Sequence, residues 1–304
     1  MTDPHDHAHA HHHGHSHGHH HGHSHGQAHH GPADLLPALL DLDAVVHAPM
    51  ISEATGIVAA TAGRPGPVRS VVDLGAGTGT GTVALARRFP DAVVTAVDLS
   101  TEMLDAVRRR ADEAGLSEQV RTVRADIGSD GLPVDAVDVV WASAMLHEVP
   151  DPRAALATLR SALAPGGVLA VVEMDAPPRL LPDDLEALES RLRDVTDAAS
   201  PAYHPDWAPT LVDSGFTSVT THPLTVDATY DPDSPGGAYA ALELTRLVRE
   251  GREALSDEDR RAFDTILSDR GSAASSLPRR LHGVDTVHVR SHRTLWTGLA
   301  PEQP

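Results

Sequence analysis

The chain has 304 residues, of which 40 % are hydrophobic, and this is enough to bury one large core. It contains no cysteine and no lysine, which excludes disulfides, iron–sulfur centres, a cysteine nucleophile, Schiff-base catalysis and a Walker-type phosphate loop. The 43 acidic residues outnumber the 24 basic ones and give a formal charge of −19, which disfavours nucleic acids and anionic lipid surfaces as partners.

The first 31 residues differ in composition from the remainder of the chain. Of the 22 histidines, 15 precede residue 31, interleaved with Gly, Ser, Ala and Asp, and seven are left for the folded part. Because this segment has almost no apolar side chains to offset backbone ordering, we expect 1–31 to be disordered without metal. Imidazoles at this density bind Ni²⁺, Zn²⁺, Cu²⁺ or Co²⁺ without selectivity, and we expect no catalytic metal. The expected ligands are His11, His12, His13, His15, His17, His19, His20, His21, His23 and His25.

No run of about 18 apolar residues occurs, and the histidine-rich start lacks the apolar segment of a signal peptide. We therefore expect a cytoplasmic protein that does not enter the membrane. Arginine use without lysine is typical of bacteria with a high GC content.

In chain order, apolar residues at helical spacing predict two short helices within 32–67, followed by a Gly/Pro-rich break at 63–67. Apolar runs then alternate with helical segments of 10–15 residues. The expected strands are 68–74, 92–98, 120–126, 137–144 and 167–175, and the expected helices between them are 80–89, 101–114 and one beginning at Asp151-Pro152. Strands that are apolar on both faces and alternate with helices predict a doubly wound α/β fold with a parallel sheet.

After residue 175 the pattern is looser. We expect a helix around 185–195, a strand near 217–228, helices around 236–250 and 257–268, and a last strand near 286–297. Ser256 and Asp259 resemble a capping box for the second of these helices. The two helices form an insertion at about 229–285, before the last strand, for which we expect the role of a lid or of a homodimer surface.

The most informative segment is DLGAGTGTG at 73–81, which leaves an apolar strand and enters a helix. Glycines let the backbone turn sharply and approach a ligand, and the helix N-terminus presents free N–H groups. The dinucleotide fingerprint G-x-G-x-x-G requires its third glycine at 80 or 82, and both positions are threonine. The spacing therefore argues against a dinucleotide site.

The pattern D-x-G-x-G-x-G that remains resembles the first motif of class I S-adenosylmethionine-dependent methyltransferases. The resemblance continues, in order, through AVDLS at 96–100, RADI at 124–127, WASAMLHEVPDP at 141–152 and LAPGGVLAVVEMD at 163–175. The segment at 141–152 is similar to the fourth-strand motif of ubiquinone/menaquinone-biosynthesis-type methyltransferases, although Glu148 replaces that family's second histidine. The resemblance implies a Rossmann-like seven-stranded sheet, and it divides the chain into the tail 1–31, capping helices 32–67, a cofactor-binding core 68–175 and a C-terminal part 176–300.

The resemblance also implies an S-adenosylmethionine site. In the family, the glycine loop wraps the amino acid and ribose, while acids at the ends of the first three strands lie near the methionine amino group, the ribose hydroxyls and the adenine amino group. Here these acids are Asp73, Asp98 and Asp126. The whole set of implied cofactor-binding residues is Asp73, Gly75, Ala76, Gly77, Gly79, Asp98, Leu99, Met103, Asp126, Ile127 and Ser143.

The implied reaction is transfer of a methyl group to a small-molecule acceptor by in-line displacement. Because a sulfonium methyl is already activated, the protein chiefly aligns acceptor, methyl carbon and sulfur and excludes water. A hydroxyl acceptor benefits from a base with a pKa near neutrality, for which His147 and His204 are the candidates. The residues leave open whether the acceptor atom is O, N or C. The alternative is a metal-storage or metal-responsive protein whose methyltransferase-like domain binds the cofactor without a catalytic role.

Overall fold

The computed structural model describes residues 36–62, 66–132, 134, 136–199, 205–268 and 280–302. The chain divides into two units, 1–30 and 31–304, and all described elements belong to the second. The predicted metal ligands His11 to His25 and the candidate base His204 lie outside the described residues.

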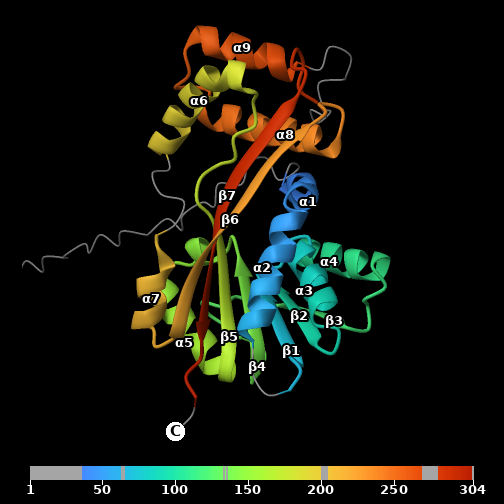
Figure 1. Cartoon of the computed structure of the whole chain (residues 1–304), viewed down its shortest axis with the longest axis vertical. Helices are drawn as coiled ribbons and strands as arrows, with labels where there is room; N and C mark the ends of the chain where they lie inside the picture. Colours follow the sequence, from blue (N-terminus) through green and yellow to red (C-terminus); the bar gives the residue numbers. More distant parts are fainter. Residues whose placement is uncertain are drawn as a thin grey trace, which may run out of the picture. The chain divides into compact units, whose positions relative to one another are not determined.

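Seven strands of the described chain form one sheet, in the order β3-β2-β1-β4-β5-β7-β6 (Figure 1). The first five strands run parallel, and β7 is antiparallel to both of its neighbours, β5 and β6. This arrangement confirms the predicted doubly wound α/β fold. The strands are β1 (Ser70–Leu74), β2 (Val93–Asp98), β3 (Val120–Arg124), β4 (Val137–Ser143), β5 (Leu163–Met174), β6 (Thr217–Tyr230) and β7 (Val287–Leu299).

The helices begin where the local sequence can cap them. Ser100 Oγ, Asp151 Oδ1 and Ser256 Oγ each accept a hydrogen bond from a backbone N–H in the first turn that follows, which confirms all three predicted helix starts. The helices are α1 (Leu36–Val46), α2 (Ala48–Thr61), α3 (Thr80–Arg88), α4 (Thr101–Glu113), α5 (Pro152–Ala162), α6 (Glu186–Ala199), α7 (Trp207–Asp213), α8 (Pro235–Gly251) and α9 (Asp257–Leu267), with 3₁₀ turns η1 (Leu146–Glu148) and η2 (Asp183–Leu185).

The two short helices predicted before the first strand are α1 and α2, and they meet at His47. Within the described residues, no single helix is long and apolar enough to cross a bilayer. Only α1 and α2 taken together meet those length and composition criteria, and the two are bent by 73°.

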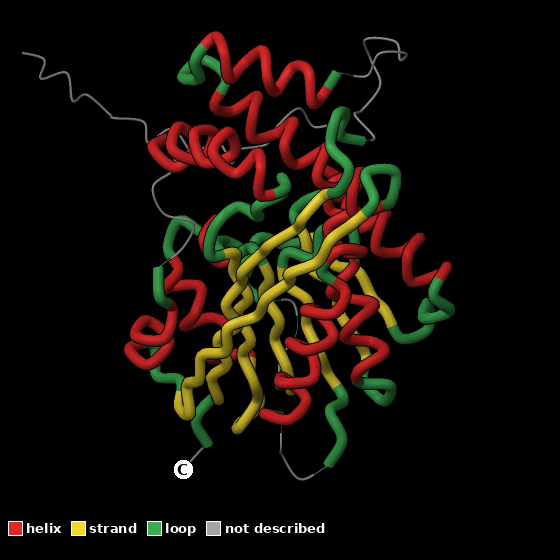
Figure 2. The backbone as a smooth tube through the Cα atoms, turned by 45° about the horizontal axis from the view of Figure 1, so that its top comes forward, coloured by secondary structure: helices red, strands yellow, loops and turns green. Residues whose placement is uncertain are grey.

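Helices cover both faces of the sheet (Figure 2). Val71 and Val72 are consecutive in β1 and completely buried, yet they belong to two different hydrophobic cores, because successive side chains of a strand point to opposite faces. Side chains of α2, α3 and α8 fill the first core, and side chains of α5 and α7 fill the second. The apolar runs of the parallel strands are explained by this burial on both sides.

Strands β6 and β7 extend beyond the end of their neighbour β5. Pairing between β5 and β7 ends at Met174↔Arg293, whereas the β6–β7 ladder continues to Tyr230↔Val287. This two-stranded extension leads to α8 and α9, and α8 contacts α1, α6 and β7 (Figure 1). The N-terminal helix and the inserted helix α8 are therefore neighbours at the end of the sheet where the parallel strands finish.

Candidate functional site

The predicted cofactor residues gather where β1, β2, β3 and β4 end. Asp98 and Ser143 are the last residues of β2 and β4, Asp73 is one residue before the end of β1, and Asp126 follows β3 by two residues. Because these strands are parallel and adjacent, their carboxyl ends share one edge of the sheet. Ligands of open α/β sheets bind at this edge.

The glycine loop depends on glycine for two reasons. Gly75, Gly77 and Gly79 all have positive φ, between 52° and 89°, which side chains rarely adopt. A Cβ on Gly75 would also lie 2.7 Å from Met145 Cγ, and a Cβ on Gly79 would lie 3.0 Å from the backbone of Val107 in α4. The loop is thus packed closely from both sides.

Asp98 ties the glycine loop to the start of α4. One carboxylate oxygen accepts a hydrogen bond from Gly77 N at 2.9 Å, and the other accepts one from Ser100 N at 2.8 Å. The next side chain, Leu99, is 59 % exposed, and Met103 one turn later is half-buried. A carboxylate beside an exposed apolar side chain fits a ligand with a vicinal diol and a flat apolar ring.

The end of β3 adds a second acid and a second apolar side chain to this edge. Asp126 is exposed, and its Oδ1 accepts a hydrogen bond from Gly128 N at 2.8 Å, which shapes the turn after the strand. Ile127 is buried. Both lie in the turn that follows β3, the strand next to the one that ends at Asp98, as the implied adenine contacts require.

Asp73 lies below the loop rather than on its surface. Its carboxylate is buried and accepts a hydrogen bond from Thr82 Oγ1 at 2.6 Å, so it anchors the first turn of α3. Burial raises its pKa to about 6, and the charge of Asp98 adds to this effect. A Cβ on Gly81 would lie 3.1 Å from Asp73 Oδ2 and 3.2 Å from Nε1 of Trp141, a buried nitrogen with no hydrogen-bond partner among the described residues.

The backbone turns sharply after β4. Ala144 has φ of 50°, in the left-handed region that costs an alanine about 1–2 kcal/mol, and its N–H donates to Val172 O at 2.8 Å. This turn places Met145 over Gly75. Strained backbone of this kind gathers at functional sites, and the sequence alone contains no sign of it.

His147 is held by a glutamate that sequence reasoning missed. Its Nδ1 lies 2.7 Å from Oε2 of Glu173, and Glu173 Oε1 accepts hydrogen bonds from the backbone N–H groups of Leu146 and His147. The hydrogen bond to Glu173 raises the pKa of His147, and partial burial opposes this rise. Nε2 lies 3.2 Å from Oε1 of Glu148. The signal in the sequence is an acid inside the apolar run VLAVVEM of β5.

A second, half-buried charge cluster joins α1, β7 and α8. Asp43 Oδ1 lies 2.6 Å from Arg293 Nη2 and 3.0 Å from His47 Nδ1, and His47 packs edge-on against the Tyr239 ring. Burial raises the pKa of Asp43, but Arg293 and His47 outweigh it and lower the value to about 2. One turn before Asp43, Leu40 would touch a Cβ on Gly77, so α1 lies over the glycine loop.

Within the described residues, no group of three or more His, Asp or Glu side chains is arranged to hold a metal ion. The candidate base His147 is paired with acids, as described above, and His204 is not placed.

Residues 71–167 match a family model described as a methyltransferase domain. A trans-aconitate 2-methyltransferase of Methylobacterium radiotolerans is 34 % identical over 186 residues, which are 61 % of this chain and 63 % of the relative. A trans-aconitate 2-methyltransferase of Rhodococcus jostii is 38 % identical over 155 residues, 48 % of this chain and 58 % of the relative. A putative methyltransferase structure from Bacillus halodurans has a TM-score of 0.49 at 18 % identity and covers 82 % of this chain and 99 % of its own. The chain spans less than two thirds of the length of these two relatives.

Proposed function

We propose that this chain, whose residues 71–167 match a methyltransferase-domain model, is an enzyme that transfers the methyl group of S-adenosylmethionine to a small organic acceptor. The observation that carries the proposal is the shared edge at which the glycine loop, Asp98 and the exposed Leu99 lie together. Each of the three offers a different kind of contact: backbone N–H groups, a carboxylate and an apolar surface.

The parts of the cofactor match these contacts in turn. Asp98 would accept hydrogen bonds from the two ribose hydroxyls, as a carboxylate does with a vicinal diol. Leu99, Met103 and Ile127 would enclose the adenine ring, and Asp126 would bind its amino group. The glycine loop would surround the amino acid part, because its backbone is open to close approach.

The bound cofactor supplies an electrophilic methyl group on a sulfonium, so the chain's own residues need chiefly to position the acceptor and exclude water. Met145 and Leu40 would close the site over the glycine loop. His147 would contact the acceptor through Nε2, because its Nδ1 donates to Glu173 and the Glu148 carboxylate beside Nε2 is exposed and would turn aside. In its neutral form Nε2 accepts a proton from a hydroxyl acceptor, and in its charged form it holds an anionic one.

We propose that the acceptor is a small carboxylic acid. The relatives from Methylobacterium radiotolerans and Rhodococcus jostii carry the name trans-aconitate 2-methyltransferase, which supports this class. The raised pKa of His147 also supports it, since an imidazolium attracts a carboxylate. A carboxylate oxygen is already a nucleophile, so its methylation requires positioning more than a base.

The test is calorimetry with S-adenosylhomocysteine, followed by transfer of labelled methyl from S-adenosylmethionine to a panel of small carboxylic acids that includes trans-aconitate. We expect one binding site per chain and methyl ester formation with at least one acid. No cofactor binding would overturn the proposed activity. Cofactor binding with turnover only on amines or phenols would overturn the acceptor class alone.

From composition alone, we also propose that the histidine-rich segment binds divalent metal ions as an accessory arm, that the enzyme works in the cytoplasm and that the inserted helices serve as a lid or dimer surface. A metal on this arm has no part in methyl transfer. EDTA should therefore remove bound Ni²⁺ or Zn²⁺ and leave the rate of methyl transfer unchanged.

A further inference from the structure

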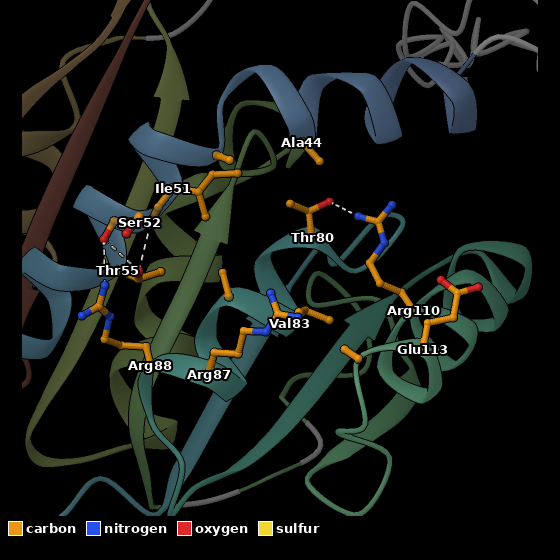
Figure 3. Close-up of a pocket in the computed structure, with 13 residues that line it drawn as sticks. Ala44, Ile51, Ser52, Thr55, Thr80, Val83, Arg87, Arg88, Arg110 and Glu113 are labelled. Atoms are coloured by element: carbon orange, nitrogen blue, oxygen red, sulfur yellow. Dashed lines mark hydrogen bonds between the residues drawn. The ribbon is translucent and has the colours of Figure 1, made fainter. Parts of the chain in front are cut away.

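A pocket of about 620 Å³ lies between α2, α3 and α4, and the last residues of α1 close one end of it (Figure 3). This volume is in the range of small-molecule sites. Apolar side chains such as Ile51 and Val83 form part of the wall, and Ser52, Thr55 and Thr80 contribute polar groups. None of the residues assigned above to the cofactor lines the pocket, so it is a separate cavity.

Three arginines and one glutamate line this pocket, in a chain whose formal charge is −19. Arg88 and Arg110 lie on opposite sides, with Arg87 extending between them (Figure 3). Arg88 donates to Ser52 O at 3.0 Å, and Arg110 is bonded to Thr80 and to Asp41. The side chain of Arg87 makes no hydrogen bond or ion pair with any residue in the described part of the chain, so its donors are available.

We propose that this pocket is a second binding site, which takes a small organic anion with two or more negative groups. Guanidinium groups bind carboxylate and phosphate oxygens through paired hydrogen bonds. Arg110 is already paired with Asp41, whereas Arg87 and Arg88 have no carboxylate partner among the described residues, and two such groups match a ligand with more than one anionic group. Ile51, Val83 and Ala84 would contact the carbon skeleton. A neutral or cationic ligand would leave Arg87 and Arg88 without an anionic partner.

The pocket touches the same helix that covers the cofactor loop. Leu40 of α1 lies against Gly77, and Ala44 one turn later lines the pocket. Arg110 bonds both to Asp41 of α1 and to Thr80, which follows Gly79 directly. An anion in the pocket would hold α1 and α2 against α3 and α4, and so keep Leu40 over the loop. This coupling to the cofactor rests on the proposed function, whereas binding of the anion does not.

The first experiment titrates citrate or inorganic pyrophosphate into the metal-free full chain at pH 8 and constant ionic strength. We expect at least one of the two anions to bind saturably, with one molecule per chain. Arg87→Gln should weaken this binding about tenfold or more, because it removes a charge-assisted contact. Binding of citrate alone assigns a carboxylate ligand, and binding of pyrophosphate alone assigns a phosphate ligand. Binding of neither overturns the proposal.

Two further variants separate the pocket from general charge effects. Arg109→Gln removes the same charge from an exposed position of α4 outside the pocket and should leave anion binding unchanged. Ala84→Phe keeps every charge but fills the cavity, and it should abolish binding. Equal loss in Arg109→Gln and Arg87→Gln, or full binding by Ala84→Phe, would overturn the assignment to this pocket.

The coupling is tested by the affinity for S-adenosylhomocysteine with and without saturating anion. We expect about a fivefold gain in the wild type and none in Arg87→Gln, and the cofactor must raise anion affinity by the same factor. The same gain in both proteins would overturn the coupling. Failure of S-adenosylhomocysteine to bind at all would contradict the proposed function, while the anion titration would still decide the pocket.

Discussion

His147 and Glu173 form a close pair at the ends of two neighbouring strands, with Nδ1 2.7 Å from Oε2. Glu173 is 1 % exposed and also accepts the backbone N–H groups of Leu146 and His147, so one carboxylate fixes both the ring and the turn that carries it. The pairing assigns a proton to Nδ1 and leaves Nε2 beside the exposed Glu148, whose Oε1 lies 3.2 Å away.

Replacement of Glu173 by Gln is expected to lower the pKa of His147, because the hydrogen bond to Glu173 is the largest cause of its rise. A raised histidine pKa adds stability that is complete below about pH 6.5 and is lost as pH rises through the raised value. The stability gap between wild type and Glu173→Gln should therefore narrow with rising pH. The ring-proton NMR titration of His147, identified by its loss in His147→Asn, measures the pKa directly.

Glu148→Gln is the matched control for this prediction. Glu148 is exposed and has a smaller effect on the pKa of His147 than Glu173 has, so the titration should move less. If the two variants shift the titration equally, Glu173 does not control the ring.

Asp98→Ala is expected to weaken S-adenosylhomocysteine binding about tenfold or more, because it removes a charged acceptor of hydrogen bonds. It also leaves the N–H groups of Gly77 and Ser100 without their side-chain acceptor, so the loop should loosen. Calorimetry gives the affinity. The control is Asp105→Ala. Asp105 is exposed in α4 and is paired with Arg108, so this variant should bind S-adenosylhomocysteine like the wild type. Unchanged affinity in Asp98→Ala would move the ribose site elsewhere.

The parallel strands of the sheet could be predicted from sequence because each is buried on both faces and is therefore a continuous apolar run. The start of β5 could not be predicted correctly from the sequence. Pro165 and Gly166 predict a break before a strand at 167, yet β5 begins at Leu163, because it pairs there with Val137 across a register shift. Helix α7 could not be predicted from the sequence either, because it has only seven residues and contains Pro209. Tertiary packing of Trp207 and Leu211 stabilises it.

The backbone part of the candidate site followed from local patterns, whereas its side-chain pairs did not. The spacing within the loop at 73–81 and the acid at the end of the next apolar run are enough to place Gly75, Gly77 and Asp98 at one edge of a sheet. The pair Asp43–Arg293 joins residues 250 positions apart, and neither residue is in a motif. Such contacts depend on where helices and distant strands pack, and a single sequence contains no record of that.

Asp73→Asn is expected to stabilise the protein at pH 8 by about 1–3 kcal/mol, since a pKa shift of two units corresponds to about 3 kcal/mol and part of the Thr82 hydrogen bond is lost. The sign follows from the raised pKa of about 6: the folded state binds the proton more tightly than the unfolded state, so stability falls as pH rises from about 3.8 to about 6 and is constant above that. Thermal unfolding at pH 8 and pH 5 tests this. The gain in stability from Asp73→Asn should be smaller at pH 5 than at pH 8. Equal destabilisation by the variant at both pH values would contradict the prediction.

Arg293→Met is expected to cost about 1–3 kcal/mol of unfolding free energy at pH 7, because it leaves the half-buried Asp43 with His47 as its remaining partner. The pKa of Asp43 is lowered to about 2, so the pair's stabilisation is complete above about pH 3.8 and is lost as pH falls through 2. The gap between wild type and variant should therefore be constant from pH 7 to about 4 and shrink below that. Guanidinium unfolding followed by tryptophan fluorescence gives the free energies.

Arg252→Met, which removes an exposed partner of Asp264, should change stability much less. The double variant Asp43→Leu/Arg293→Met should recover most of the loss, since it removes the half-buried charge together with its partner. No recovery would mean that Arg293 acts through packing alone.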